Sequence, residues 1–193
     1  MEPRIPSSRV TFGKSLAHHG TFAGTPAQGE DNVWLAVETF VAVLNRDWSL
    51  GLLRAQDVSG SPNEYPGVDA CAVFRNGRYL SLQVVRAMPS NFYQEQAHAG
   101  LAQSTGGLDD AATYLRRAIE RKTSRAASPS ITLLIDGTAA PQLALFAPTV
   151  FVEQHGAWAS ALDWESIWVV GPSSANRLDL EVGEVCLPHA WIA

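Results

Sequence analysis

The sequence predicts an α/β fold, in which a mixed β-sheet is flanked by helices. A β-hairpin is expected at residues 68–86, because two β-rich runs are separated by a turn that ends in Asn76-Gly77. Two nearly continuous apolar runs, 131–135 and 167–170, are typical of strands buried on both faces. Helical patterns lie between these strands. This alternation of strands and helices predicts the α/β class.

Composition and charge indicate an ordinary globular chain. Its 193 residues are 46% hydrophobic and 17% charged, which fits one domain. The formal net charge of -5 gives no general attraction to polyanions, so nucleic-acid binding would need a local basic patch. Cys71 and Cys186 do not make a disulfide framework, which favours a reducing cytoplasm. We expect a cytoplasmic protein without a signal peptide or membrane span, since no apolar run is long enough.

The first predicted helix follows a segment without clear periodicity. Residues 1–29 are expected to be a flexible N-terminal arm, and residues 30–193 a single domain. Glu30 belongs to an acidic start of a helix, where negative charge is favourable, and apolar residues recur at helical spacing through Asn45. Residues 48–53 either extend this helix or form a short strand.

Further elements are predicted after the hairpin. Residues 89–107 form a loop or an irregular helix, and residues 110–125 form an amphipathic helix that Asp109 or Asp110 caps. A short strand at 146–153 and a helical turn at 157–162 are expected next. A last strand at 178–182 precedes an irregular end.

The register of the hairpin decides which side chains share a face. A two-residue loop would pair Asp69 with Val84, whereas a three-residue loop with a left-handed Gly77 pairs Asp69 with Gln83. The second register is favoured because it puts Asp69, Ser81 and Gln83 on one face. An acid and an amide that converge there bind a cation or hydrogen-bond each other. The opposite face then collects Val68, Ala70, Ala72, Phe74, Leu80, Leu82 and Val84.

This hairpin resembles the core of the PD-(D/E)XK nuclease superfamily. In that core an Asp on one strand is followed across a hairpin by an acid or Gln that begins an x-Lys triplet. Residues 65–69 resemble the Pro-x-Asp motif in part, and residues 82–86 resemble the second-strand motif with Gln83 at the Glu/Gln position. Val85 stands where the lysine is expected. The resemblance spans residues 30–171 and implies a restriction-endonuclease-like core.

Two functions follow from the resemblance. One is a nuclease that hydrolyses phosphodiester bonds in DNA or RNA with Mg²⁺ or Mn²⁺, held by Asp69, Gln83 and Glu38 on the first helix. The other is a degenerate relative that binds nucleic acid, a protein partner or a second copy without cleavage. Val85 can neither move a proton nor offer positive charge. With the neutral Gln83 and the net negative charge, it favours the degenerate relative.

Basic residues on the second helix are the remaining candidates. Lys122 continues the inward stripe after Ile119, and the resemblance permits it to replace the missing lysine as a catalytic cation. Alternatively, it extends into solvent near the helix end. Arg117, Arg121 and Arg125 recur at every fourth position, so they either contact nucleic-acid phosphates or form a solvated face.

The other candidates also have ordinary structural roles. Asp69 can bond nearby main chain at the start of a strand, Gln83 can be an amide satisfied in a polar patch, and Glu38 can turn into water. The histidines form no metal motif.

Overall fold

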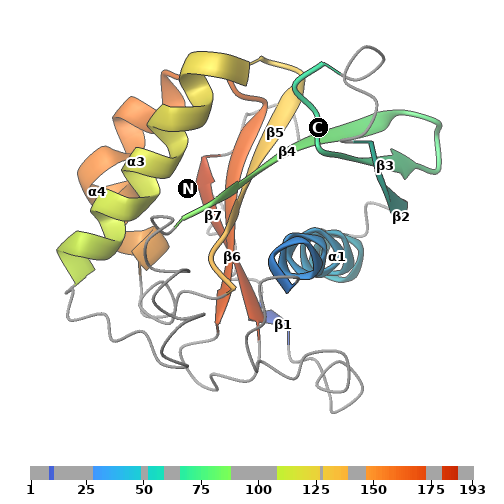
Figure 1. Ribbon diagram of the computed structural model, residues 1–193, viewed down its shortest axis with the longest axis horizontal. Helices are drawn as coiled ribbons and strands as arrows, with labels where there is room; N and C mark the ends of the chain where they lie inside the picture. The colour runs from blue at the N-terminus through green and yellow to red at the C-terminus, as the bar shows by residue number, and fades with distance from the viewer. Residues whose placement is uncertain are drawn as a thin grey trace, which may run out of the picture.

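The protein folds around a mixed β-sheet with helices on both sides (Figure 1). The computed structural model describes residues 9–10, 28–48, 52–58, 66–87, 108–126, 128–138, 147–172 and 180–186. Within these residues, seven strands pair in the order β1-β7-β6-β5-β4-β3-β2. The strands are β1 (Arg9–Val10), β2 (Leu52–Asp57), β3 (Ala70–Phe74), β4 (Tyr79–Arg86), β5 (Ile131–Asp136), β6 (Ser166–Pro172) and β7 (Leu180–Cys186). The helices are α1 (Gln28–Trp48), α3 (Leu108–Ala126) and α4 (Ala147–Ser160).

The sheet has an antiparallel half and a parallel half that share β4. Strands β2, β3 and β4 form an antiparallel meander, whereas β4, β5 and β6 run parallel. Parallel neighbours need a crossover connection. Helix α3 lies in the crossover from β4 to β5, and α4 lies in the crossover from β5 to β6. Strand β7 then returns antiparallel to β6. This mixed sheet confirms the predicted α/β class.

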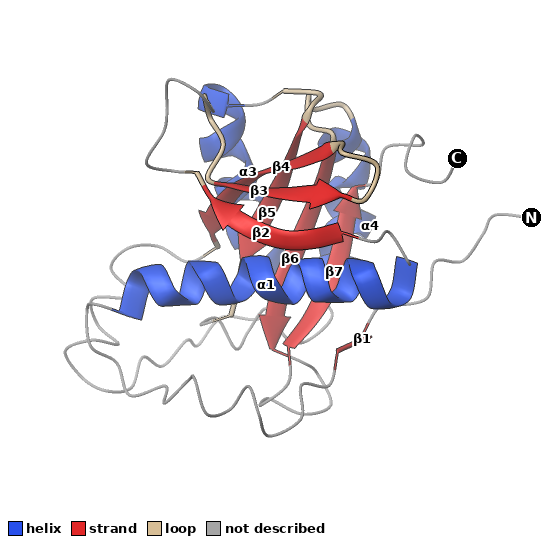
Figure 2. Ribbon diagram, turned by 90° about the vertical axis from the view of Figure 1, so that its right-hand side faces the viewer, coloured by secondary structure: helices blue, strands red, loops and turns tan. Residues whose placement is uncertain are grey.

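Two apolar layers join the sheet to its helices. Helix α1 crosses one face, and α3 and α4 lie behind the other (Figure 2). Because side chains alternate along a strand, neighbouring residues of β5 enter different layers. Leu133 and Ile135 pack on the α3 side, and Leu134 packs on the α1 side. Under α1, the rings of Phe40 and Trp168 lie 5.3 Å apart.

Most predicted elements are present. Helices α1 and α3 begin at Gln28 and Leu108, each two residues before the predicted start, and both apolar runs form strands. The open choice at residues 48–53 is decided in favour of a strand, because β2 begins there. Within the predicted N-terminal arm, Arg9–Val10 pair with β7. The loop or helix predicted at 89–107 lies outside the described residues.

One predicted element is wrong. The β-branched and aromatic side chains of residues 146–153 predict a strand, but residues 147–153 begin helix α4. Phe151 and Ala159, about two turns apart, are both buried in the layer shared with α3. Packing along one helical face therefore outweighs local strand propensity. The last strand, predicted at 178–182, lies at Leu180–Cys186.

The β3–β4 hairpin has the predicted register. Ala70 pairs with Leu82, so Asp69 and Gln83 are the adjoining positions on the two chains, and the alternative that faces Asp69 with Val84 is excluded. The loop has three residues and ends at Gly77, whose φ is 82°. The apolar face lies under α1 as predicted, except for Val68, which packs on the α3 side. Strict alternation does not extend to Val68, because the regular strand begins only after Asp69.

Replacement of Gly77 by Ala should destabilise the protein by about 1 kcal/mol, because an L side chain is strained at positive φ. An added Cβ would meet no atom within 4 Å, so the cost is conformational rather than steric. Asparagine tolerates the left-handed region better, and Gly77→Asn should therefore lose less stability. Urea unfolding measures both variants, and equal losses would contradict this explanation.

Candidate functional site

Asp69 and Gln83 form a hydrogen-bonded pair on the α3 side of the sheet. Gln83 Nε2 donates to Asp69 Oδ2, and the Val84 main-chain N–H donates to the same oxygen at 2.7 Å. The Gln83 side chain is buried, with 3% of the residue exposed, and Asp69 is half-buried. The pair meets because Asp69 directly precedes Ala70, whose ladder partner Leu82 directly precedes Gln83, so the two side chains lie next to each other on one face.

The main chain fixes Asp69 from two sides. Its N–H donates to the Leu82 carbonyl at 2.8 Å in β4, and its carbonyl accepts the Val58 N–H at 3.1 Å just after β2. Strand β3 begins only at Ala70, so the Asp69 carboxylate provides an acceptor to Val84 where the β3 ladder starts. Asp69 thus ties together the beginning of β3 and the far part of β4.

This arrangement fits a resident Mg²⁺ or Mn²⁺ poorly. Such ions prefer several oxygen ligands with negative charge. Here Gln83 donates an N–H to Asp69 and brings no negative charge. In the described part of the chain, no group of three His, Cys, Asp or Glu side chains could hold a metal. At this pair the described side chains offer one carboxylate and one neutral amide.

Glu38 is not brought to this pair. It is an exposed residue of α1, which covers the opposite face of the sheet, and its Oε1 accepts a hydrogen bond from Trp34 Nε1 at 3.0 Å. The bond joins side chains one helical turn apart. Its geometry matches the structural alternative, a residue at the boundary between core and water.

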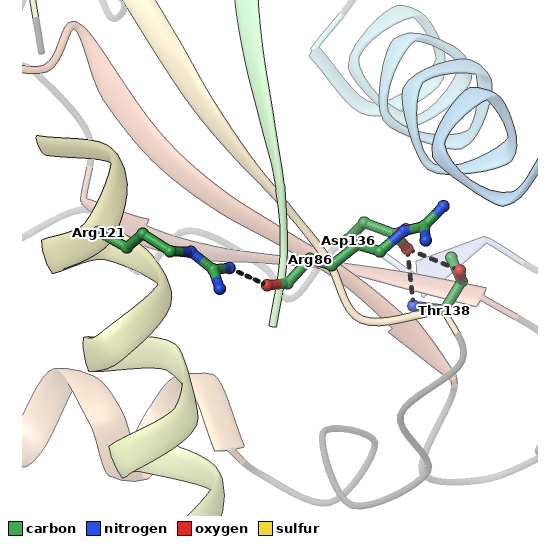
Figure 3. Close-up of polar contacts among 4 residues, drawn as sticks. All are labelled: Arg86, Arg121, Asp136 and Thr138. Carbon is green, nitrogen blue, oxygen red and sulfur yellow. Dashed lines mark hydrogen bonds and ion pairs between the residues drawn. The ribbon is translucent and has the colours of Figure 1, made fainter. Parts of the chain in front are cut away.

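The positions expected to supply a cation are also separated. Val85 lies in the core beneath α3. Lys122 is a half-buried residue of α3, and among the described contacts none joins it to Asp69 or Gln83. A different residue of that helix reaches β4. Arg121 Nη2 donates to the Arg86 carbonyl at 2.9 Å (Figure 3).

The basic residues of α3 therefore differ in their contacts. Arg117 and Arg125 are exposed. Arg121, between them in the predicted stripe, is exposed but anchored to the end of β4. Arg116 forms an ion pair with Glu120 at 2.8 Å and lies over the Trp158 ring at 5.1 Å, so it also joins α3 to α4.

A second polar cluster lies at the carboxyl ends of β4 and β5. Arg86 and Asp136 are register partners on these parallel strands, and Arg86 Nε lies 3.7 Å from Asp136 Oδ2 (Figure 3). Asp136 Oδ1 accepts bonds from the Thr138 N–H at 3.0 Å and hydroxyl at 2.6 Å. Asp136 is only 2% exposed. Burial raises the pKa of its carboxyl group, against the opposing effects of Thr138 and Arg86.

Sequence reasoning missed this cluster. An aspartate directly after a buried apolar run was a usable signal, since the carboxyl ends of parallel strands often carry polar functional residues. Its partner Arg86 could not be chosen without the pairing of β4 with β5.

Truncation of Asp69 to Ala should cost about 2–3 kcal/mol, because the Val84 N–H and the Gln83 amide would lose their shared acceptor in a largely buried place. Asp69→Asn retains one acceptor oxygen and should lose less. The free energy of unfolding in urea measures both effects. Wild-type stability in Asp69→Ala would show that the network contributes little.

Asp136→Asn should gain stability relative to the parent protein as the pH rises. The raised pKa means that the unfolded aspartate releases its proton at lower pH than the folded one, so rising pH favours unfolding of the parent. Asparagine does not titrate and can still accept the Thr138 bonds. The difference in stability between Asp136→Asn and the parent should begin to grow at the pH where an aspartate in the unfolded chain ionises. It should stop growing at the higher pH where the folded Asp136 carboxyl group is ionised. Thermal unfolding across a pH series tests the sign, and a shrinking difference would contradict it.

Comparison with known proteins gives no independent identification. No family model, curated protein or solved structure matches the chain. Across the described residues, none of the helices has the length and apolar composition required to cross a membrane.

Proposed function

We propose that this chain is a nuclease-like domain that binds nucleic acid through phosphate contacts and does not cleave it. The observation that carries the proposal is the closed network of Asp69, Gln83 and the Val84 N–H, with Val85 in the core beside it. These are the positions at which the resemblance to PD-(D/E)XK nucleases would require metal ligands and a lysine.

Phosphodiester cleavage needs charge at this place. A metal ion or a cation must neutralise the negative charge that develops on the phosphate, and the attacking water must be activated. The pair offers one carboxylate whose Oδ2 already accepts two hydrogen bonds. Gln83 brings no negative charge, and Val85 has no ionisable group. The chemistry of these side chains supports binding without cleavage.

The basic half of α3 supports nucleic acid as the partner. Five of the 14 Lys and Arg residues in the chain lie between residues 116 and 125, with one acid among them. Arginine binds phosphate well because its planar fork presents several donors. Since the whole chain carries a net charge of -5, this local patch would have to provide the attraction.

Binding should be measured by fluorescence anisotropy with labelled single-stranded and double-stranded oligonucleotides over a salt series. We expect affinity that falls with salt, and the double variant Arg117→Glu/Arg125→Glu should bind at least about tenfold more weakly with a smaller salt dependence. Both side chains are exposed, so the fold should be preserved. In parallel, the parent protein should leave the oligonucleotides intact with Mg²⁺ or Mn²⁺.

A matched control carries the same charge reversals at Arg75 and Arg78, which are exposed at the β3–β4 hairpin, away from α3 (Figure 1). This control should bind nearly as well as the parent. Absence of binding by the parent at low salt would refute the proposed function. Metal-dependent cleavage that Asp69→Ala abolishes would instead support the alternative, an active Mg²⁺-dependent nuclease.

A further inference from the structure

Two arginines are held in place at the carboxyl end of β4. Arg86 is the last residue of the strand, and Arg121 reaches its carbonyl from α3. We infer that Arg86 and Arg121 bind different phosphates of one nucleic-acid strand, with Asp136 as the positioning residue for Arg86. This inference rests on the proposed function and deepens it, because it specifies where the phosphate backbone passes.

Arg121 is prepared for binding by its main-chain anchor. One terminal nitrogen donates to the Arg86 carbonyl at 2.9 Å, and the residue remains exposed. A guanidinium has five N–H donors, so a single bond fixes its position without exhausting its capacity. An arginine that is already ordered loses less conformational entropy when it binds an anion.

Arg86 is held by the carboxylate of Asp136. Its Nε faces Asp136 Oδ2, and its side chain is 31% exposed while that of Asp136 is 3% exposed. Two bonds from Thr138 to the other oxygen fix the carboxylate in turn. A buried charged pair is often no more stable than apolar residues of the same volume. Orientation of the Arg86 guanidinium is a functional reason for this buried carboxylate.

The geometry favours a polymer over a single phosphate. The Arg86 side chain extends away from Arg121, toward the side of the sheet that α1 covers (Figure 3). The two guanidinium groups thus lie on opposite sides of the strand end, so we assign them to different phosphates. A nucleic-acid strand that passes across the end of β4 presents several phosphates and can therefore meet both groups. The basic stripe of α3 continues this path through the exposed Arg117 and Arg125.

The test is oligonucleotide anisotropy with the full chain and four single variants. Arg86→Gln and Arg121→Gln should each weaken binding about tenfold and lower the salt slope by about 0.7–0.9, the change for one phosphate contact. Arg75→Gln loses the same charge at the exposed hairpin loop and should bind within about twofold of the parent.

Asp136→Asn gives the sharpest result. It removes a negative charge, so simple attraction between charges predicts tighter binding to nucleic acid. A positioning role predicts weaker binding, by about three- to tenfold, because Arg86 loses its orienting partner. Urea unfolding confirms that the variant is folded. Binding equal to or tighter than that of the parent would overturn the inference.

The remaining arms separate the possible failures. Inorganic phosphate, compared with chloride at matched ionic strength, should not displace the oligonucleotide; efficient displacement would point to a single-phosphate site and overturn the two-phosphate geometry. If Arg86→Gln, Arg121→Gln and Arg75→Gln all bind alike while Arg117→Glu/Arg125→Glu is weakened, this inference fails and the proposed function stands. If the parent binds no oligonucleotide at low salt, both fail together.

Discussion

The register of the β3–β4 hairpin constrains both halves of the molecule, because β4 belongs to the antiparallel meander and to the parallel strands. A slip of one residue would exchange the two faces of β4 and bury polar side chains under α1. The three-residue loop with Gly77 at positive φ permits the observed register. From this register follow the apolar layer beneath α1 and the meeting of Asp69 with Gln83. The parallel pairing of β4 with β5 then sets Arg86 beside Asp136.

The Asp69–Gln83 pair and the Arg86–Asp136 cluster lie on opposite faces of the sheet at β4, and their carboxylates make different kinds of contact. Asp69 has a structural role, because one of its carboxylate oxygens accepts hydrogen bonds from both the Gln83 side chain and the Val84 main-chain N–H. A carboxylate used in this way holds two strands together at the point where β3 begins. Asp136 instead orients a partly exposed arginine. Burial disfavours the negative charge of Asp136, and an ionised carboxylate is what orients an arginine. Ionisation of this buried group therefore reduces the stability of the fold.

Helix α3 connects these clusters to the basic surface. Its apolar stripe packs beneath the sheet, Arg116 contacts Trp158 of α4, and Arg121 contacts the end of β4. The stripe of arginines is therefore attached to the core at Arg121 and exposed on either side of it. A basic surface held by a rigid scaffold loses less entropy on binding than a flexible one.

Elements whose signals are local could be predicted from the sequence alone. Neighbouring residues specify the hairpin loop, the periodicity of α1 and α3, and the apolar runs of β5 and β6. The meeting of Asp69 with Gln83 was also predictable, because a short loop connects their two strands. Local propensity failed at residues 146–153, where burial of Phe151 and Ala159 along one face selects a helix. The contact of Arg86 with Asp136, and the contact of Arg121 rather than Lys122 with β4, depend on the packing of the whole fold. Parallel pairing joins residues far apart in the chain, and the reach of a helical side chain depends on how the helix is set against the sheet, which no local pattern encodes.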